Sequence, residues 1–195
     1  DWPLEGHKFV GDWQFVCGVN FRCPHLSHYS LAGGAKRDYP ASILHHSPWW
    51  DYYNAVEDYF GRLAFMLTQG SAVRDVLVIH PVESAWGLLP GEDDDGKGLN
   101  HYQQAVNTIC YALSGQHYDW DFGDEDILER HARVDAGTLH VEQARYRLIV
   151  VPPAVTLRES TVAMLEDFIG SGGQVLFIGD PPALVDGKAD DRPQE

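Results

Sequence analysis

Histidine and aromatic side chains are concentrated between residues 15 and 50, which read FVCGVNFRCPHLSHYSLAGGAKRDYPASILHHSPWW. Imidazole, amide and guanidinium groups can hydrogen-bond to hydroxyl groups, and the face of an indole can stack on the C–H face of a sugar ring. Such a concentration of residue types indicates a ligand-binding surface. The candidate ligand-binding residues are Asn20, His25, His28, Tyr29, Arg37 and Trp49.

Each candidate also has a purely structural interpretation. The polar side chains after residue 20 can simply satisfy backbone groups of a loop, and residues 36–40 can be a charged turn. If that turn folds over a site, Arg37 and Asp38 would bind hydroxyl groups with bidentate geometry. One of the two indoles at 49–50 is expected to pack in the core, which leaves the other free to stack on a ligand.

The sequence has no usual motif for a metal site, a nucleotide-binding loop or a catalytic nucleophile. The Cys and His residues at 17–28 have the chemistry to bind zinc, but their spacing matches no usual zinc pattern, so we predict no metal and no cofactor. No glycine-rich phosphate loop follows the apolar run at 76–79, and Cys110 lies in a helix pattern rather than in a nucleophile elbow. Three cysteines are too few for a disulfide framework, so we expect reduced, buried thiols and a cytoplasmic protein.

The charge of the chain argues against some partners. The net charge of −15 divides into −2 for residues 1–73, with five Lys/Arg and seven Asp/Glu, and −13 for residues 74–195, with nine and twenty-two. An acidic surface repels phosphate backbones, so nucleic acid is not expected as a partner. No apolar run approaches the roughly 18 residues that span a bilayer, so no membrane is expected either. Because the chain begins at Asp1 without a Met, we expect it to be a piece of a longer protein.

Strands alternating with helices from residue 74 onward predict an α/β fold with a three-layer, mostly parallel sheet. Continuous apolar runs are typical of strands that are buried on both faces. The predicted strands lie at 76–79, 118–122, 147–151 and 174–178, with a small hairpin between 133–134 and 138–141. The predicted helices lie at 101–114, at 124–130 and from a capping box of Thr156 and Glu159 to the glycine at 170, and a loose polar tail begins at about 187.

The first 73 residues contain one predicted strand, at 15–19, and one long helix. The helix has Ser47 as N-cap and Pro48 in its first turn, and Gly70 ends it. One strand and one helix cannot close a core by themselves. We interpret residues 1–73 as the last, incomplete βα unit of a larger domain, whose strand presents the loop at 20–47, and residues 74–195 as a second domain.

Several segments together resemble a bacterial glycoside hydrolase group of large multidomain proteins, related to the α-L-rhamnosidase type and more distantly to beta-galactosidases. In that group a (β/α)8 barrel is followed by a flavodoxin-like domain similar to class I glutamine amidotransferases without the amidotransferase cysteine. The segments that carry the resemblance are GVNFRCPHLSHYSLAGGAKRDYP, SPWWDYYNAVEDYFGRLAFMLTQG, DVLVIHPVESAW, HYDWDFGDEDIL and LIVVPPAVTLRESTVAMLEDFIGSGGQVLFIGDPPALVDG.

The resemblance implies that the chain is the C-terminal portion of a glycosidase, with Asn20, His25 and His28 bordering the sugar at the mouth of the barrel. Hydrolysis of a glycoside requires two carboxyl groups. Glu83, which follows the strand at 76–79, and Asp38 are the only catalytic candidates here, and Glu83 can equally be a helix-start residue. We therefore expect the catalytic pair upstream of Asp1, the rest of the barrel as a partner, and this piece alone to be inactive.

A different class of function fits the same sequence. The acidic second domain can instead be a non-catalytic module that mediates assembly, with the aromatic loop as part of an interface. A third alternative, weaker than the other two, is a small-molecule binder that uses the C-terminal ends of the strands. We expect a homo-oligomer.

Overall fold

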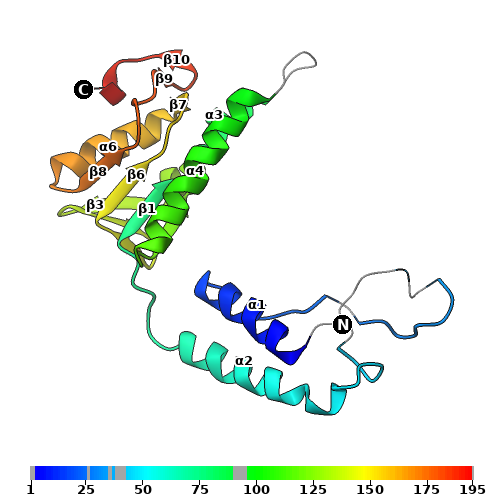
Figure 1. Ribbon diagram of the computed structural model, residues 1–195. Coiled ribbons are helices and arrows are strands. Elements are labelled where there is room, and N and C mark those ends of the chain that lie inside the picture. The colour runs from blue at the N-terminus through cyan, green and yellow to red at the C-terminus, as the bar shows by residue number, and fades with distance from the viewer. Residues whose placement is uncertain (1–2, 26, 35–36, 38–42, 90–95, 195) are drawn as a thin grey trace. The chain divides into compact units, whose positions relative to one another are not determined.

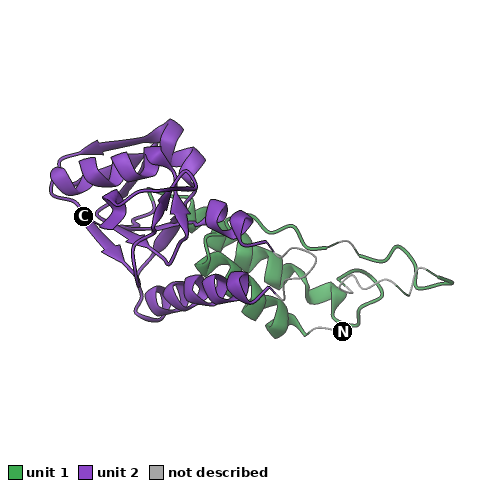
Figure 2. Cartoon of the chain, turned by 90° about the horizontal axis from the view of Figure 1, so that it is seen from above, with its two compact units in different colours: residues 1–71 green, residues 72–195 purple. Residues whose placement is uncertain are grey.

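The structure is a computed structural model that describes residues 3–25, 27–34, 37, 43–89 and 96–194 (Figure 1). The chain divides into two compact units, residues 1–71 (unit 1) and residues 72–195 (unit 2), as coloured in Figure 2. The catalytic candidate Asp38 lies outside the described residues. Within the described ranges, every helix is too short or too polar to cross a lipid bilayer.

Unit 1 consists of helices that pack through aromatic side chains. Phe15 stacks on Phe60 with ring centroids 5.4 Å apart. Gly11 permits this approach, because a Cβ atom at Gly11 would lie 2.0 Å from the Phe60 ring. The Tyr59 hydroxyl donates a hydrogen bond of 2.8 Å to the carboxylate of Asp12, which joins the two long helices. The elements are α1 (Leu4–Val16), the 3-10 helix η2 (Trp50–Tyr52) and α2 (Asn54–Leu67).

The strand predicted at 15–19 is wrong. Residues up to Val16 belong to α1, and the turn that follows ends the helix at Gly18, whose φ is +95°. Among the described residues of unit 1 no strand forms, so an extended segment here would have no neighbour for its N–H and C=O groups. The helix satisfies those groups internally, as in the 3.0 Å bond from the Cys17 N–H to the Trp13 carbonyl.

The helix predicted from Ser47 to Gly70 forms, but it starts differently. Ser47 is buried and is not an N-cap; its carbonyl accepts the N–H of Trp50 at the start of η2. The α-helix proper begins at Asn54 after Tyr53, whose φ and ψ are already helical. The chain therefore enters the helix through one tighter turn, which needs no side-chain cap.

Unit 2 contains a parallel sheet, and all four strands predicted for it are present. The continuous apolar run of the first strand is buried at every residue, as expected for a central strand. The strand order is β2-β1-β6-β8, and each neighbouring pair is parallel. The strands are β1 (Val76–Ile79), β2 (Trp120–Gly123), β6 (Leu148–Val151) and β8 (Gln174–Phe177).

Helices cover both faces of this sheet. On one face, Leu77 and Ile149 pack with Leu128 of α5 and Phe168 of α6. On the other face, Val78 and its neighbours pack with half-buried side chains of α4. The helices are α4 (Lys97–Gly115), α5 (Glu125–His131) and α6 (Glu159–Gly170), together with the short α3 (Val82–Gly87) after β1. The predicted layers of helix, parallel sheet and helix are thus present in unit 2.

Smaller strands extend unit 2. The predicted hairpin is confirmed, and a third strand that was not predicted joins it to make the sheet β3-β4-β5. A second small sheet, β10-β9-β7, occupies part of the tail that was predicted to be loose. The strands are β3 (Ala132–Asp135), β4 (Thr138–Val141), β5 (Ala144–Tyr146), β7 (Thr156–Leu157), β9 (Leu184–Val185) and β10 (Lys188–Ala189), followed by the 3-10 helix η3 (Arg192–Gln194).

The capping box predicted for α6 is wrong, because Thr156 is a strand residue. Its hydroxyl accepts the backbone N–H of Gly187, 3.0 Å away, and so ties the tail to β7. The N-cap of α6 is Arg158, without a side-chain cap. The competing hydrogen bond to Gly187 comes from 31 residues further along the chain, which a local motif cannot reveal.

Candidate functional site

The ligand-binding candidates of unit 1 lie on the irregular segment between α1 and η2. Asn20, His25, Tyr29 and Arg37 are exposed, whereas His28 is half-buried. They follow the end of a helix and not the end of a strand, so the positioning element differs from the predicted one.

The structure brings three of the imidazoles in this segment together. The ring of His28 lies 6.2 Å from that of His46, and His46 in turn packs edge-on against His45 at 5.1 Å. Imidazoles so close together can present several hydrogen-bonding nitrogens to one ligand. Among the described residues, however, no group of three or more His, Cys, Asp or Glu side chains has the arrangement to hold a metal ion.

Trp49 is the indole that packs inside unit 1. Its ring lies 5.5 Å from the buried His7 and 5.7 Å from Tyr53, and it belongs to the edge of the aromatic core. Burial and the nearby charge of Arg22 lower the pKa of His7, so this imidazole is neutral at pH 7. Trp50, at 38% exposure, is the more accessible of the two indoles and stacks on Tyr53.

Arg22 is a residue of this segment that the sequence reasoning missed. Its guanidinium lies 4.1 Å from the centroid of the Phe60 ring and 3.5 Å from a carboxylate oxygen of Glu57. The side chain is 11% exposed, so this cation–π and ionic contact holds the segment after α1 against α2. An arginine beside Cys23 gives no sequence signal of such a role.

Two of the three cysteines are more exposed than predicted. Cys17 and Cys23 are exposed and Cys110 is half-buried, and all three are free thiols. The prediction of buried thiols is therefore wrong for the first two, because Cys17 caps the exposed end of α1 and Cys23 lies on the irregular segment that follows.

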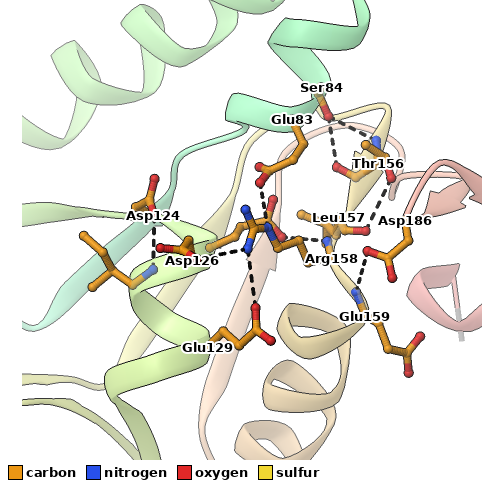
Figure 3. A network of polar contacts seen from close by, with 12 residues as sticks. Glu83, Ser84, Asp124, Asp126, Glu129, Thr156, Leu157, Arg158, Glu159 and Asp186 are labelled. Carbon is orange, nitrogen blue, oxygen red and sulfur yellow. Dashed lines mark hydrogen bonds and ion pairs between the residues drawn. The ribbon is translucent and has the colours of Figure 1, made fainter.

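In unit 2, the residues that follow three parallel strands meet around Arg158 (Figure 3). The Nε of Arg158 donates to Glu83 Oε1 at 2.6 Å, and its Nη1 lies 3.4 Å from Glu129 Oε2 and 3.5 Å from Asp126 Oδ1. Glu83 follows β1, Asp126 and Glu129 follow β2, and Arg158 directly follows β7, the short strand that comes after β6. Open α/β sheets place ligands at this carboxyl edge of the strands, and here the edge holds an ion-pair network.

A buried carboxyl group, Glu125, completes this network. Its side chain is 1% exposed, and its Oε2 accepts the backbone N–H of Arg158 at 2.7 Å. Burial raises the pKa of Glu125 to about 7; the Thr161 side chain and the Arg158 N–H oppose this shift, and the charge of Glu83 adds to it. The group therefore exchanges its proton near neutral pH, although the fold seals it from solvent.

The hydroxyl of Ser84 anchors α3 to the segment after β6. It accepts the N–H groups of Val155 and Thr156 at 3.0 and 3.1 Å, and it donates to the Thr156 carbonyl at 2.9 Å. Glu83 and Ser84 thus hold two connections of the sheet together, one by charge and one by neutral hydrogen bonds. Sequence reasoning singled out Glu83 but missed Ser84, Glu125 and Arg158, which become neighbours only through the strand order.

No protein-family model matches the chain, and no curated protein matches it by sequence. Solved structures that resemble it include two glycoside hydrolases. One is a rhamnosidase from Novosphingobium sp. PP1Y, with a TM-score of 0.57 and 18% identity over 100% of this chain and 17% of that one. The other is Gan42B, a GH42 beta-galactosidase, with a TM-score of 0.60 and 15% identity over 91% of this chain and 24% of that one. The likeness is one of fold, and the chain spans about a fifth of the length of these two glycoside hydrolases.

Proposed function

We propose that the chain is the C-terminal portion of a glycoside hydrolase whose whole form cleaves O-glycosidic bonds of carbohydrates, in the manner of a rhamnosidase or a galactosidase. The observation that carries this proposal is the likeness of fold to a rhamnosidase along the full length of the chain. The likeness to a beta-galactosidase over 91% of the chain supports the same class of reaction. A cytoplasmic location is part of the proposal.

Unit 1 is, in this proposal, the closing part of a (β/α)8 barrel. Its helices expose large apolar side chains, among them Trp13 at 64% and Val16 at 82% on α1 and Phe65 at 64% on α2. Exposed apolar patches of this kind mark surfaces that another part of a protein covers. The rest of the barrel is the proposed cover.

The sugar is proposed to lie against the segment between α1 and η2. Asn20, His25, His28, Tyr29 and Arg37 would donate and accept hydrogen bonds to its hydroxyl groups. Trp49 would border the pocket from the aromatic core. The density of imidazole and aromatic groups in this segment supports the assignment.

The reaction needs an acid and a nucleophile or base, both carboxyl groups. The Glu83 carboxylate is engaged by Arg158 at 2.6 Å, which suits a structural ion pair better than a catalytic acid. We therefore propose that the catalytic pair belongs to another part of the whole protein. Asp38 stays a candidate on its sequence position alone.

Unit 2 is proposed to be the amidotransferase-like domain of that protein. Numbered along the chain, the strands of its parallel sheet follow the order 2-1-3-4, which begins the flavodoxin-like order. The ion pairs that fill the carboxyl edge of this sheet around Arg158 support a structural role.

The whole protein, assayed on the 4-nitrophenyl glycosides of α-L-rhamnose and β-D-galactose, tests the proposal. We expect turnover of one of them, and a loss of at least tenfold in kcat/KM for His25→Ala or His28→Ala. His101→Ala is the matched control, because His101 is an exposed histidine of unit 2 on α4. Unchanged kcat/KM in both unit 1 variants would contradict the proposed sugar contacts. The absence of turnover of either glycoside would contradict the proposed reaction.

A specific observation also favours assembly as a role of unit 2. Large apolar side chains are exposed on it, namely Trp86, Leu89, Tyr111 and Tyr118, each above 60%. We propose that this surface contributes to a homo-oligomer. Light scattering of the whole protein should then give a mass above that of the monomer, and Tyr111→Lys should lower it; a strictly monomeric wild type would contradict the proposal.

A further inference from the structure

A pocket of about 350 Å³ opens at the carboxyl ends of β1 and β2, and all of its lining residues belong to unit 2. Its walls come from the connection after β1, from α3, from the end of β2 and from α4. Small-molecule sites have volumes of roughly 300–1,000 Å³, and open α/β sheets place them at this edge. The described lining residues include neither Arg158 nor its carboxylate partners, and Ser84, which lines the pocket, bonds to Val155 and Thr156.

An aromatic pair forms one side of the pocket. The imidazole of His80 lies 4.8 Å from the ring of Phe122, at an interplanar angle of 40°. Phe122 is 46% exposed although it is a residue of the parallel sheet. Val82, Leu99 and Val106 supply aliphatic surface on the other sides. A flat ring is the ligand shape that suits such an aromatic pair with aliphatic walls.

The polar groups that α4 contributes to the pocket are neutral. The amide side chains of Gln103 and Asn107 and the hydroxyl of Tyr102 come from α4. Among the described lining residues there is no Asp, Glu, Lys or Arg, although residues 74–195 carry a net charge of −13. A charged ligand would lose hydration here without gaining an opposite charge, so the lining favours a neutral ligand.

The pocket is held in shape by bonds that do not involve a ligand. The N–H of His80 donates to the carbonyl of Gly123 at 2.9 Å, which ties the ends of β1 and β2. The three hydrogen bonds of Ser84 fix α3. A preformed pocket binds without a large ordering cost, so even a small compound can occupy it.

We propose that this pocket binds a small, neutral, planar ring compound, which stacks on His80 and Phe122 and hydrogen-bonds to the amides of Gln103 or Asn107. The proposal goes beyond the glycosidase function and does not depend on it, because every residue in it belongs to unit 2 and none to the proposed sugar site.

Indole is a suitable probe, and its titration into the full chain can be followed by the backbone amide NMR signals of residues 80–85 and 99–107. We expect saturable shifts with one dissociation constant in the millimolar range or below. Val106→Trp, which fills the pocket, should weaken binding at least tenfold, and indole-3-acetate should bind at least tenfold more weakly than indole. Thr108→Ala is the matched control, because Thr108 lies on the same helix, is exposed and is not among the described lining residues of the pocket.

If Val106→Trp fails to fold, His80→Ala serves instead, since the side chain of His80 is exposed and its loss should weaken indole binding at least threefold. Shifts that do not saturate, equal binding of indole-3-acetate, or binding to the folded pocket variant within twofold of wild type would each overturn the proposal. An equal loss in Thr108→Ala would also overturn it, because binding would then not be confined to the pocket.

Discussion

Unit 2 encloses its sheet on both faces, whereas unit 1 leaves much of the apolar surface of its helices open. In unit 2 the central strand residues Val78 and Ile79 are 0% exposed, as is Phe168 of α6. In unit 1 the described core has only four buried hydrophobic residues, and residues as large as Trp13 stay exposed on the same helices. The difference indicates that unit 2 has the core of an independent domain, while unit 1 depends on a further surface to cover it.

The largest expected difference between the units comes from emptying each core. Phe168→Ala should cost unit 2 about 3–5 kcal/mol of unfolding free energy, as a fully buried Phe typically does. Phe60→Ala in unit 1 should cost less, because fewer groups surround that ring. Urea unfolding followed by circular dichroism measures both, with Ile169→Ala, 53% exposed, as the neutral control. Equal losses of unfolding free energy in the two variants would contradict the described difference between the two cores.

The next effect is a pH dependence confined to unit 2. The pKa of Glu125 is raised from 4.5 to about 7, so between these values the folded state binds more protons than the unfolded chain. Its free energy of unfolding should therefore fall as pH rises from about 4.5 to 7, by roughly 3 kcal/mol for a shift of this size. Glu125→Gln should remove this fall and leave the protein more stable than wild type at pH 8.

The free energy of unfolding of wild type and of Glu125→Gln is measured at pH 4.5 and at pH 8. The difference between the two proteins gives the contribution of Glu125, because the other titrating groups are common to both. Glu129→Gln is the control, because Glu129 is also a carboxylate of the Arg158 network but its side chain is 52% exposed. The assignment of this pH dependence to Glu125 is wrong if the free energy of unfolding still falls with pH in Glu125→Gln. It is also wrong if that fall is lost in Glu129→Gln.

Ser84→Ala should have a smaller effect. It removes the partner of two backbone N–H groups and one carbonyl in a buried position, which should cost about 2 kcal/mol. Thr108→Ala on α4 is the control, since its hydroxyl bonds to a carbonyl on an exposed face. Thermal unfolding compares the two, and a loss at Ser84 no larger than that at Thr108 would show that α3 is not anchored in this way.

The last prediction concerns two glycines in the helices of unit 1. Gly11→Ala should destabilise the packing of α1 on α2 by roughly 1–3 kcal/mol, because the new methyl group would overlap the Phe60 ring. Gly61→Ala, where the same methyl group meets open space, should stabilise α2 by up to about 1 kcal/mol. Tryptophan fluorescence during unfolding reports on both, and equal signs for the two variants would contradict the described helix contact.

The parts of unit 2 that could be predicted are those that local patterns determine. The continuous apolar runs at β1 and β6 predicted buried strands, and the short segment around β3 and β4 predicted a hairpin. The network around Arg158 could not be predicted, because Glu83 and Arg158 are 75 residues apart and become neighbours only when the sheet orders its strands. In the sequence, Glu125 is one of several acidic residues at the start of the predicted helix at 124–130.

Unit 1 was predicted less well for a physical reason. The segment at 15–19 has the composition of a strand, but a parallel strand needs neighbours on its edges, and among the described residues of unit 1 there are none. The spacing of His7, Gly11 and Phe15, four residues apart on one face of α1, was the available sign of a helix that continues this far. The histidines and aromatic residues were found from composition alone, while their grouping around His46 depends on the fold.

The most direct test is a crystal structure of the whole protein with its monosaccharide product bound. The account predicts that the sugar lies within about 3.2 Å of a nitrogen of His25 or His28, with the helices of unit 1 packed against the rest of a barrel. A sugar held in a pocket built from other parts of the protein, with both histidines directed to bulk solvent, would contradict it.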